Sequence, residues 1–157
     1  MQEPFKTFTG LISSINRNIR RIKTEIMANH NLKCPHVSTL YYLYVDGALT
    51  LKQLCEMCNE DKGAISRSVK SLEEEGLVES GSKLKKYKNK LRLTEKGKIV
   101  GKDVAVKIDG VIEAAVQGVS QEQRDAVYGG LSLISKNLQS AKIPMENSLR
   151  TKREKDL

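Results

Sequence analysis

A block of basic residues dominates the charge of this 157-residue chain. Residues 83–102 hold nine lysines and arginines and one acidic residue, so this window alone accounts for the formal charge of +8. Cations concentrated in one segment are typical of proteins that bind polyanions, whereas a charge bias that only serves solubility is spread over the surface. The sequence therefore favours a polyanionic partner, nucleic acid first, with a solvated basic loop as the alternative.

A second set of residues suited to nucleic-acid contact lies upstream, in residues 61–75. Three apolar residues at helical spacing predict one buried stripe of a helix that Asp61 would cap. The opposite face carries short or basic side chains and no acid: Lys62, Gly63, Ser66, Arg67 and Lys70. Short side chains allow close approach to base edges, and an arginine fork fits guanine O6 and N7 or a phosphate. The alternative is an amphipathic surface helix without this role.

The thiols and histidines form weaker patterns. Cys55 and Cys58 make a C-x-x-C late in a predicted helix, away from the helix N-terminus that stabilises thiolates, so core thiols are favoured over a redox pair. His30, Cys34 and His36 lie around one turn and are the best candidates for metal or redox sensing, against a simpler role as polar residues at a helix junction. We expect no resident metal or cofactor, and no enzyme, because no nucleophile–base pair accompanies the two histidines.

The elements that must position these residues are mainly helical. Residues 5–29 repeat apolar side chains at spacings of four and three, which predicts a helix packed on its own domain or against a second subunit. Further helices are predicted from Pro35 to residue 46, from Thr50 to residue 58, and over 61–75. Strands at 77–80 and 90–93 then flank a lysine-rich hairpin tip, Thr94 caps a long helix, and a last helix follows the break at Gly118.

A short helix, a turn, a second helix and a hairpin together make a winged helix-turn-helix. The run LTLKQL at 49–54, the run DKGAISRSVKSLEEEGLV at 61–78 and the run LRLTEKGK at 91–98 resemble the MarR family of bacterial winged-helix regulators. The segment LKCPHV at 32–37 resembles the family's opening of its second helix. The resemblance extends over about residues 5–138.

The resemblance implies a mainly α fold with a small β-hairpin wing, in which a winged helix-turn-helix is flanked by N- and C-terminal dimerisation helices. It divides the chain into a dimerisation helix (1–31), a DNA-binding lobe (32–94), two further dimerisation helices (95–143) and a polar, flexible tail (144–157). The implied homodimer interface contains Phe8, Ile12, Ile15, Ile19, Ile108, Ile112, Leu131 and Leu138.

The implied function is sequence-specific regulation of transcription, with repression favoured, at a pseudo-palindromic operator in double-stranded DNA. The five residues of the 61–75 helix would face the groove, and the wing would contribute Lys83, Lys85, Lys86, Lys88, Asn89 and Lys90. Many relatives have an Asp–Arg pair at the wing tip, where this chain has Lys85 and Lys86. Lysines favour phosphate contact over minor-groove reading.

A small-molecule effector would bind near His36, Tyr41 and Tyr44 and release the DNA. The alternatives are a structural or replication-associated winged-helix protein that binds duplex without sensing, and a regulator that senses metal or oxidants through Cys34, His30 and His36. With no apolar run long enough to span a bilayer and no secretory pattern at the start, we expect a cytoplasmic protein without a membrane partner.

Overall fold

The computed structural model describes residues 4–81 and 89–141. Along these residues the elements are α1 (Pro4–Ala28), α2 (His36–Val45), β1 (Leu49–Thr50), α3 (Leu51–Cys58), α4 (Lys62–Glu74), β2 (Val78–Ser80), β3 (Lys90–Leu93), α5 (Glu95–Ala115) and α6 (Gln121–Ser140). They fall into two compact units, the first containing α1 to α5 and the second containing α6. The predicted mainly helical fold with a small sheet is confirmed. None of the described helices is long and apolar enough to cross a membrane.

Side-chain caps fix where the helices begin, as the sequence predicted. Thr50 and Gln53 form a reciprocal capping box at the start of α3, and Asp61 Oδ1 accepts the Ala64 amide at 2.8 Å to start α4. Thr94 Oγ1 accepts the Gly97 amide at 3.0 Å to start α5. These bonds satisfy amides that have no partner within the helix, so the helix starts are encoded locally. The start of α2 differs from its prediction: Pro35 is the residue before the helix, which begins at His36.

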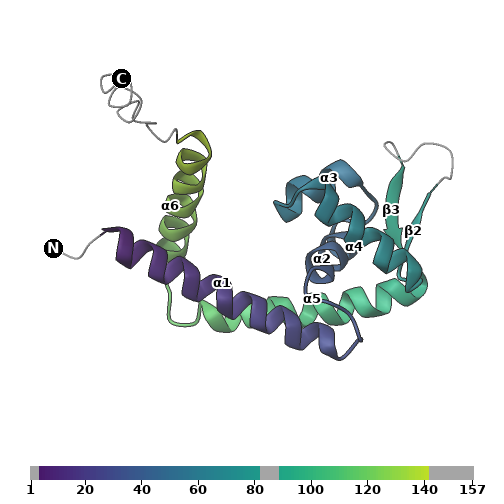
Figure 1. Cartoon of the computed structure of the whole chain (residues 1–157). Helices are drawn as coiled ribbons and strands as arrows, with labels where there is room; N and C mark the ends of the chain where they lie inside the picture. The colour runs from purple at the N-terminus through teal and green to yellow at the C-terminus, as the bar shows by residue number, and fades with distance from the viewer. Residues whose placement is uncertain (1–3, 82–88, 142–157) are drawn as a thin grey trace, which may run out of the picture. The chain divides into compact units, whose positions relative to one another are not determined.

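The helix-turn-helix and the sheet share one hydrophobic core with α5. Figure 1 shows α2, α3 and α4 gathered around the end of α5 that adjoins β2 and β3. The most deeply buried apolar side chains come from the four helices α2 to α5 and from the end of α1: Met27, Val37, Leu40, Leu54, Leu72 and Val104. A single core of this kind holds α4 in a fixed position relative to α5.

The sheet contains a third strand that the sequence did not predict. β1 pairs antiparallel with β3, which also pairs with β2, so the order is β1-β3-β2. Leu91 lies opposite Leu49 on one side and Ser80 on the other. Because β1 is only two residues long, it has no alternating pattern that a sequence could show. Its pairing ties the start of α3 to the base of the hairpin.

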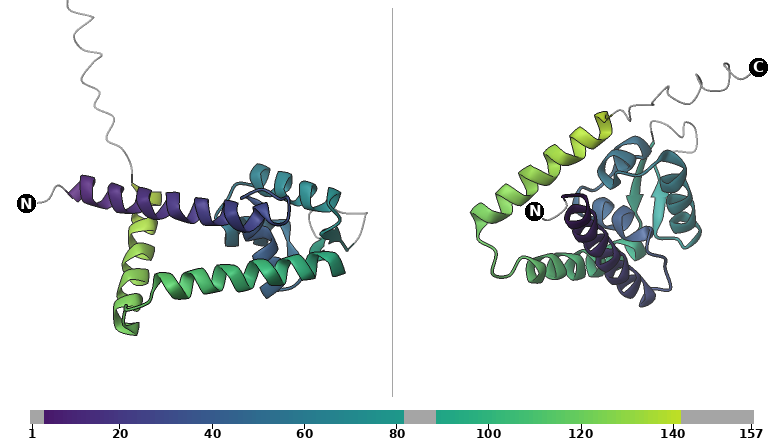
Figure 2. Two further views of the ribbon diagram at one scale, coloured as in Figure 1. Left: turned by 90° about the horizontal axis from the view of Figure 1, so that it is seen from below. Right: turned by 60° about the vertical axis from the view of Figure 1, so that its left-hand side comes forward.

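α1 changes from exposed to buried along its length. Its apolar stripe is exposed at Ile12, Ile15 and Ile19, half-buried at Ile22 and buried at Ile26. Figure 2 shows its C-terminal end against the helix-turn-helix and its N-terminal half projecting beyond that lobe. Within its own unit, the helix therefore uses only the C-terminal part of a stripe that continues for several more turns.

α6 contains no buried residue. Its side chains at spacings of four and three are exposed to between 39% and 62%: Val127, Leu131, Ile134 and Leu138. Ser120 and Gln123 form a capping box at its start, so the helix begins at a defined residue although nothing in the described residues covers its apolar stripe. A helix stabilised in this way requires a partner surface to bury that stripe.

Candidate nucleic-acid interface

α4 presents the acid-free face that the sequence predicted. Ile65, Val69 and Leu72 are buried, and the other side of the helix exposes Lys62, Gly63, Arg67 and Lys70, with Ser66 half-buried. Glu74 lies one turn beyond Lys70, with 3.8 Å between the carboxylate and the ammonium. The N-terminal two turns of α4 are therefore the more cationic part, and there the helix dipole also favours an anion.

A small polar contact orients α4 against α2. The hydroxyls of Thr39 and Ser68 are 3.2 Å apart, and both side chains are buried. Ser68 Oγ also lies 3.5 Å from the Pro35 carbonyl oxygen, just before α2 begins. A buried hydroxyl pair costs free energy unless it is satisfied, so this contact favours one rotational setting of α4 over its neighbours.

Three residues at the beginning of α5, Thr94, Lys96 and Gly97, contact the turn that follows α4. Thr94 Oγ1 donates to the Gly76 carbonyl at 2.7 Å, and Lys96 Nζ donates to the Glu75 carbonyl at 2.8 Å. Gly97 lies so close to the Leu77 carbonyl that a Cβ there would overlap the oxygen. The two hydrogen bonds satisfy the carbonyls of Glu75 and Gly76, directly after α4, and join this turn to the beginning of α5.

The wing is described only at its base. Lys90 is exposed and Asn89 half-buried, whereas Lys83, Lys85, Lys86 and Lys88 lie outside the described residues. On the outer face of the sheet, Glu79 and Arg92 are directly opposed, with Arg92 Nε 2.8 Å from Glu79 Oε1. This pair was not singled out from the sequence, because the register that brings the two residues together depends on the hairpin.

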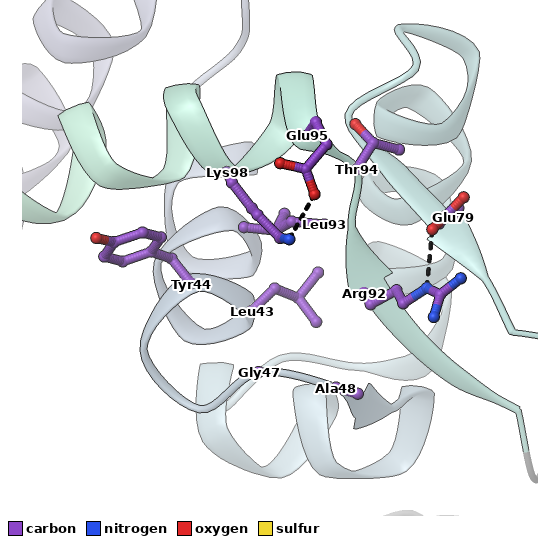
Figure 3. Close-up of a pocket in the computed structure, with 10 residues that line it drawn as sticks. All are labelled: Leu43, Tyr44, Gly47, Ala48, Glu79, Arg92, Leu93, Thr94, Glu95 and Lys98. Carbon is purple, nitrogen blue, oxygen red and sulfur yellow. Dashed lines mark hydrogen bonds and ion pairs between the residues drawn. The ribbon is translucent and has the colours of Figure 1, made fainter.

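A cavity of about 740 Å³ lies at the wing root, between the end of α2, the sheet and the start of α5. Figure 3 shows Leu43 and Leu93 in its wall, with the Arg92–Glu79 and Lys98–Glu95 ion pairs at its sides. Tyr44, one of the predicted effector-site residues, is among its lining residues. The four charged side chains are engaged with one another, so the cavity offers no unpaired charge to a ligand.

A second cavity, of about 450 Å³, lies between α1 and the helix-turn-helix. Arg20 and Lys23 of α1 face Ile65 and Ser68 of α4 across it, and the Cys34 and Cys58 thiols also line it. Lys23 Nζ donates to Ser38 Oγ at 3.0 Å. The volume falls within the range of about 300–1,000 Å³ that is typical of small-molecule sites.

The other predicted effector residues are used within the fold. His36 is buried and its Nδ1 accepts the Lys33 amide at 3.2 Å; burial, helped by Lys33, lowers its pKa. The hydroxyl of Tyr41 donates to Asp109 Oδ1 at 2.9 Å, and this bond is the main cause of the raised Tyr41 pKa. Neither residue lines the two cavities described above.

The candidate sensing residues His30 and Cys34 contact different parts of the fold and not each other. His30 Nε2 lies 2.7 Å from Asp103 Oδ2, which also accepts Lys107 Nζ at 2.7 Å, and Cys34 Sγ lies 3.9 Å from the Arg20 carbonyl. Across residues 4–81 and 89–141, no three His, Cys, Asp or Glu side chains are arranged to hold a metal ion. Burial raises the pKa of Cys58 to about 11, which keeps this thiol protonated.

This architecture is similar to that of known proteins. The family model described as MarR family matches residues 30–83, the segment that contains α2, α3, α4 and β2. The winged helix of this chain is similar to that of the MarR family. Comparison with curated protein sequences gives no match.

Solved MarR-family structures share the fold at low sequence identity. A MarR family regulator from Neisseria meningitidis is 18% identical with a TM-score of 0.75, over 88% of this chain and 95% of that one. A MarR family regulator from Listeria monocytogenes, complexed with 26mer DNA, is 21% identical with a TM-score of 0.72, over 88% and 90%. Staphylococcus aureus MarR, in complex with salicylate and kanamycin, is 21% identical with a TM-score of 0.70, over 87% and 93%.

Proposed function

We propose that this protein is a homodimeric, sequence-specific DNA-binding regulator of transcription, and that it acts as a repressor at a pseudo-palindromic operator. The observation that carries the proposal is the outward face of α4, whose five positions carry no acid and which lies in the same lobe as the strands at the base of the lysine-rich hairpin. A helix with such a face enters the major groove, and the cations of the hairpin neutralise adjacent phosphates. The MarR-family match and the relative solved with DNA support it.

The exposed apolar stripes support the dimer. Ile12, Ile15 and Ile19 on α1, Ile112 on α5, and Leu131 and Leu138 on α6 are each at least 38% exposed. Phe8 and Ile108, the other two predicted interface residues, are half-buried. A second copy of the chain would bury these stripes, and the resulting two-fold axis would pair two α4 helices with two half-sites about 34 Å apart.

The proposal includes release by a small molecule. The 450 Å³ cavity supports this part, because its walls come from α1 on one side and from α4 on the other. A ligand that filled it would contact both the dimerisation helix and the DNA-contacting helix, so it could favour one relative position of the two. The relative that was solved with salicylate also supports an effector of small size.

Selection from a pool of randomised duplexes tests the function. We expect the protein to enrich a pseudo-palindrome and to bind it ~10³-fold or more tightly than a scrambled duplex at the same salt concentration. A ratio near one would overturn the proposal in favour of a structural DNA-binding protein. The enriched duplex then allows release to be measured, with salicylate as the first probe.

A further inference from the structure

Gly63 occupies a position where neighbouring side chains, not the backbone, would crowd a Cβ. It is the second residue of α4 and has no positive φ, so its backbone conformation is open to any residue. A Cβ at this position would lie 3.0 Å from Asp61 Oδ1 and 3.3 Å from Arg67 Nη1. The guanidinium of Arg67 therefore lies back along the helix, over the first turn of α4.

The side chain on the other side of Gly63 is held in place. Asp61 Oδ1 accepts the Ala64 amide at 2.8 Å, so the carboxylate cannot turn away without losing the cap of α4. A methyl group at position 63 would thus displace the more mobile neighbour, the guanidinium. Glycine is also a poor helix former, about 1 kcal/mol worse than alanine in a helix interior. The chain thus has a weaker helix former at a position that the Arg67 guanidinium approaches.

We propose that Gly63 is a positioning residue for Arg67, and that the two act as a unit in reading one guanine of the operator. This inference rests on the proposed function, in which α4 lies in the major groove. Arginine reads guanine through two parallel bonds to O6 and N7, which require the fork to approach in one direction. The absence of a Cβ at Gly63 leaves room for the guanidinium over the first turn, beside the Asp61 carboxylate that the cap holds in place.

Another role for Gly63 would be to let the DNA itself approach the helix. The two roles differ in their dependence on Arg67. A methyl group that blocks the DNA weakens binding whether or not Arg67 is present, whereas a methyl group that redirects Arg67 has no effect once Arg67 is removed. A double-mutant cycle separates them, because coupling energy appears only between residues that act together.

The test compares wild type, Gly63→Ala, Arg67→Ala and the double variant. Affinities are measured at one salt concentration for the duplex that wild type enriches from a randomised pool and for a scrambled duplex. We expect Gly63→Ala to weaken binding to the enriched duplex by ~10-fold or more, the value of one lost bidentate contact, and to leave the scrambled duplex unchanged. In the Arg67→Ala background the same substitution should change neither affinity. Thermal unfolding should show Gly63→Ala to be as stable as wild type or more stable.

Three results would overturn the inference. An equal loss in both backgrounds would assign Gly63 to direct DNA approach, and no loss in either would leave it without a role. In these two cases the proposed function stands, because wild type has still enriched a duplex. If wild type enriches none, the proposed function and this inference fail together.

Discussion

At the scale of single residues, burial decides which of the reactive side chains can take part in chemistry. Cys55 and Cys58 share one helix turn, and the structure contains both as free thiols. Burial raises the pKa of Cys58 to about 11, so the nucleophilic thiolate is scarce at neutral pH. This agrees with the preference, from sequence, for packed thiols over a redox pair.

The protonated state of Cys58 predicts slow alkylation. At pH 8 the thiolate population of Cys58 in the folded protein should be about 100-fold lower than that of a thiol with a pKa near 9, so iodoacetamide should modify it correspondingly slowly. Peptide mass spectrometry over time measures the rate, and the same reaction in guanidinium chloride is the control. Equal rates in folded and unfolded protein would contradict the assignment.

Because the pKa of Cys58 is higher in the folded protein than in the unfolded chain, the stability that this thiol contributes is complete below about pH 9 and is lost as pH rises toward 11.

At the scale of elements, the junction of α4 and α5 depends on a close approach between the start of α5 and the turn that follows α4. Gly97 allows α5 to touch the Leu77 carbonyl, and Thr94 and Lys96 bond the two carbonyls before it. A longer side chain at position 97 would push the start of α5 away from the turn that ends α4. Both the orientation of α4 and the stability of the lobe depend on this approach.

Gly97→Ala should therefore destabilise the protein by about 1–3 kcal/mol, the usual cost of overpacking against a backbone that cannot move aside. Urea denaturation followed by circular dichroism gives the free energy of unfolding. Gly110→Ala, in the same helix, is the matched control, because nothing lies within 4 Å of a Cβ there. The control should be neutral or stabilising by up to about 1 kcal/mol. Similar stabilities for the two variants would show that the approach at Gly97 is not tight.

The elements that the sequence revealed are those with local signals. Thr50, Asp61 and Thr94 are capping residues placed directly before amphipathic helices, so their helices could be located from the sequence alone. β1 could not be found, because two residues show no period, and the His30–Asp103 contact joins residues 73 positions apart. Of the candidate site, the α4 face followed from helical spacing, whereas the 450 Å³ cavity depends on how α1 packs, which no local pattern specifies.

At the scale of the whole molecule, charge and apolar surface are segregated along the chain. The cationic excess lies in residues 83–102, whereas the large apolar side chains left exposed on α1 and α6 repeat at spacings of four and three. The cationic surface favours a polyanionic partner, and the exposed apolar stripes favour packing against another helix. The proposed dimer on duplex DNA satisfies both.

Substitution within the stripes should separate the subunits. We expect wild type to sediment at twice the chain mass of 17.6 kDa, and Ile15→Glu and Leu131→Glu to shift it toward the single-chain mass, because each places a charge in an apolar contact. Ile99→Glu is the control, since Ile99 is 74% exposed but lies outside the predicted interface. Sedimentation equilibrium at micromolar concentration measures the masses. A wild-type protein with the mass of one chain would contradict the dimer.

The junction at Gly97 also determines which part of the chain can be exchanged between relatives. Because Thr94 and Lys96 donate to the carbonyls of the turn that follows α4, a transplanted α4 would arrive without the residues that hold this turn. Under the proposed function, the unit that would transfer DNA preference is therefore the whole segment 61–97, which contains the cap, the helix, the wing and the residues that hold the turn. Chimeras cut within that segment would inherit the proposed base-contacting side chains of one parent and the helix orientation of the other.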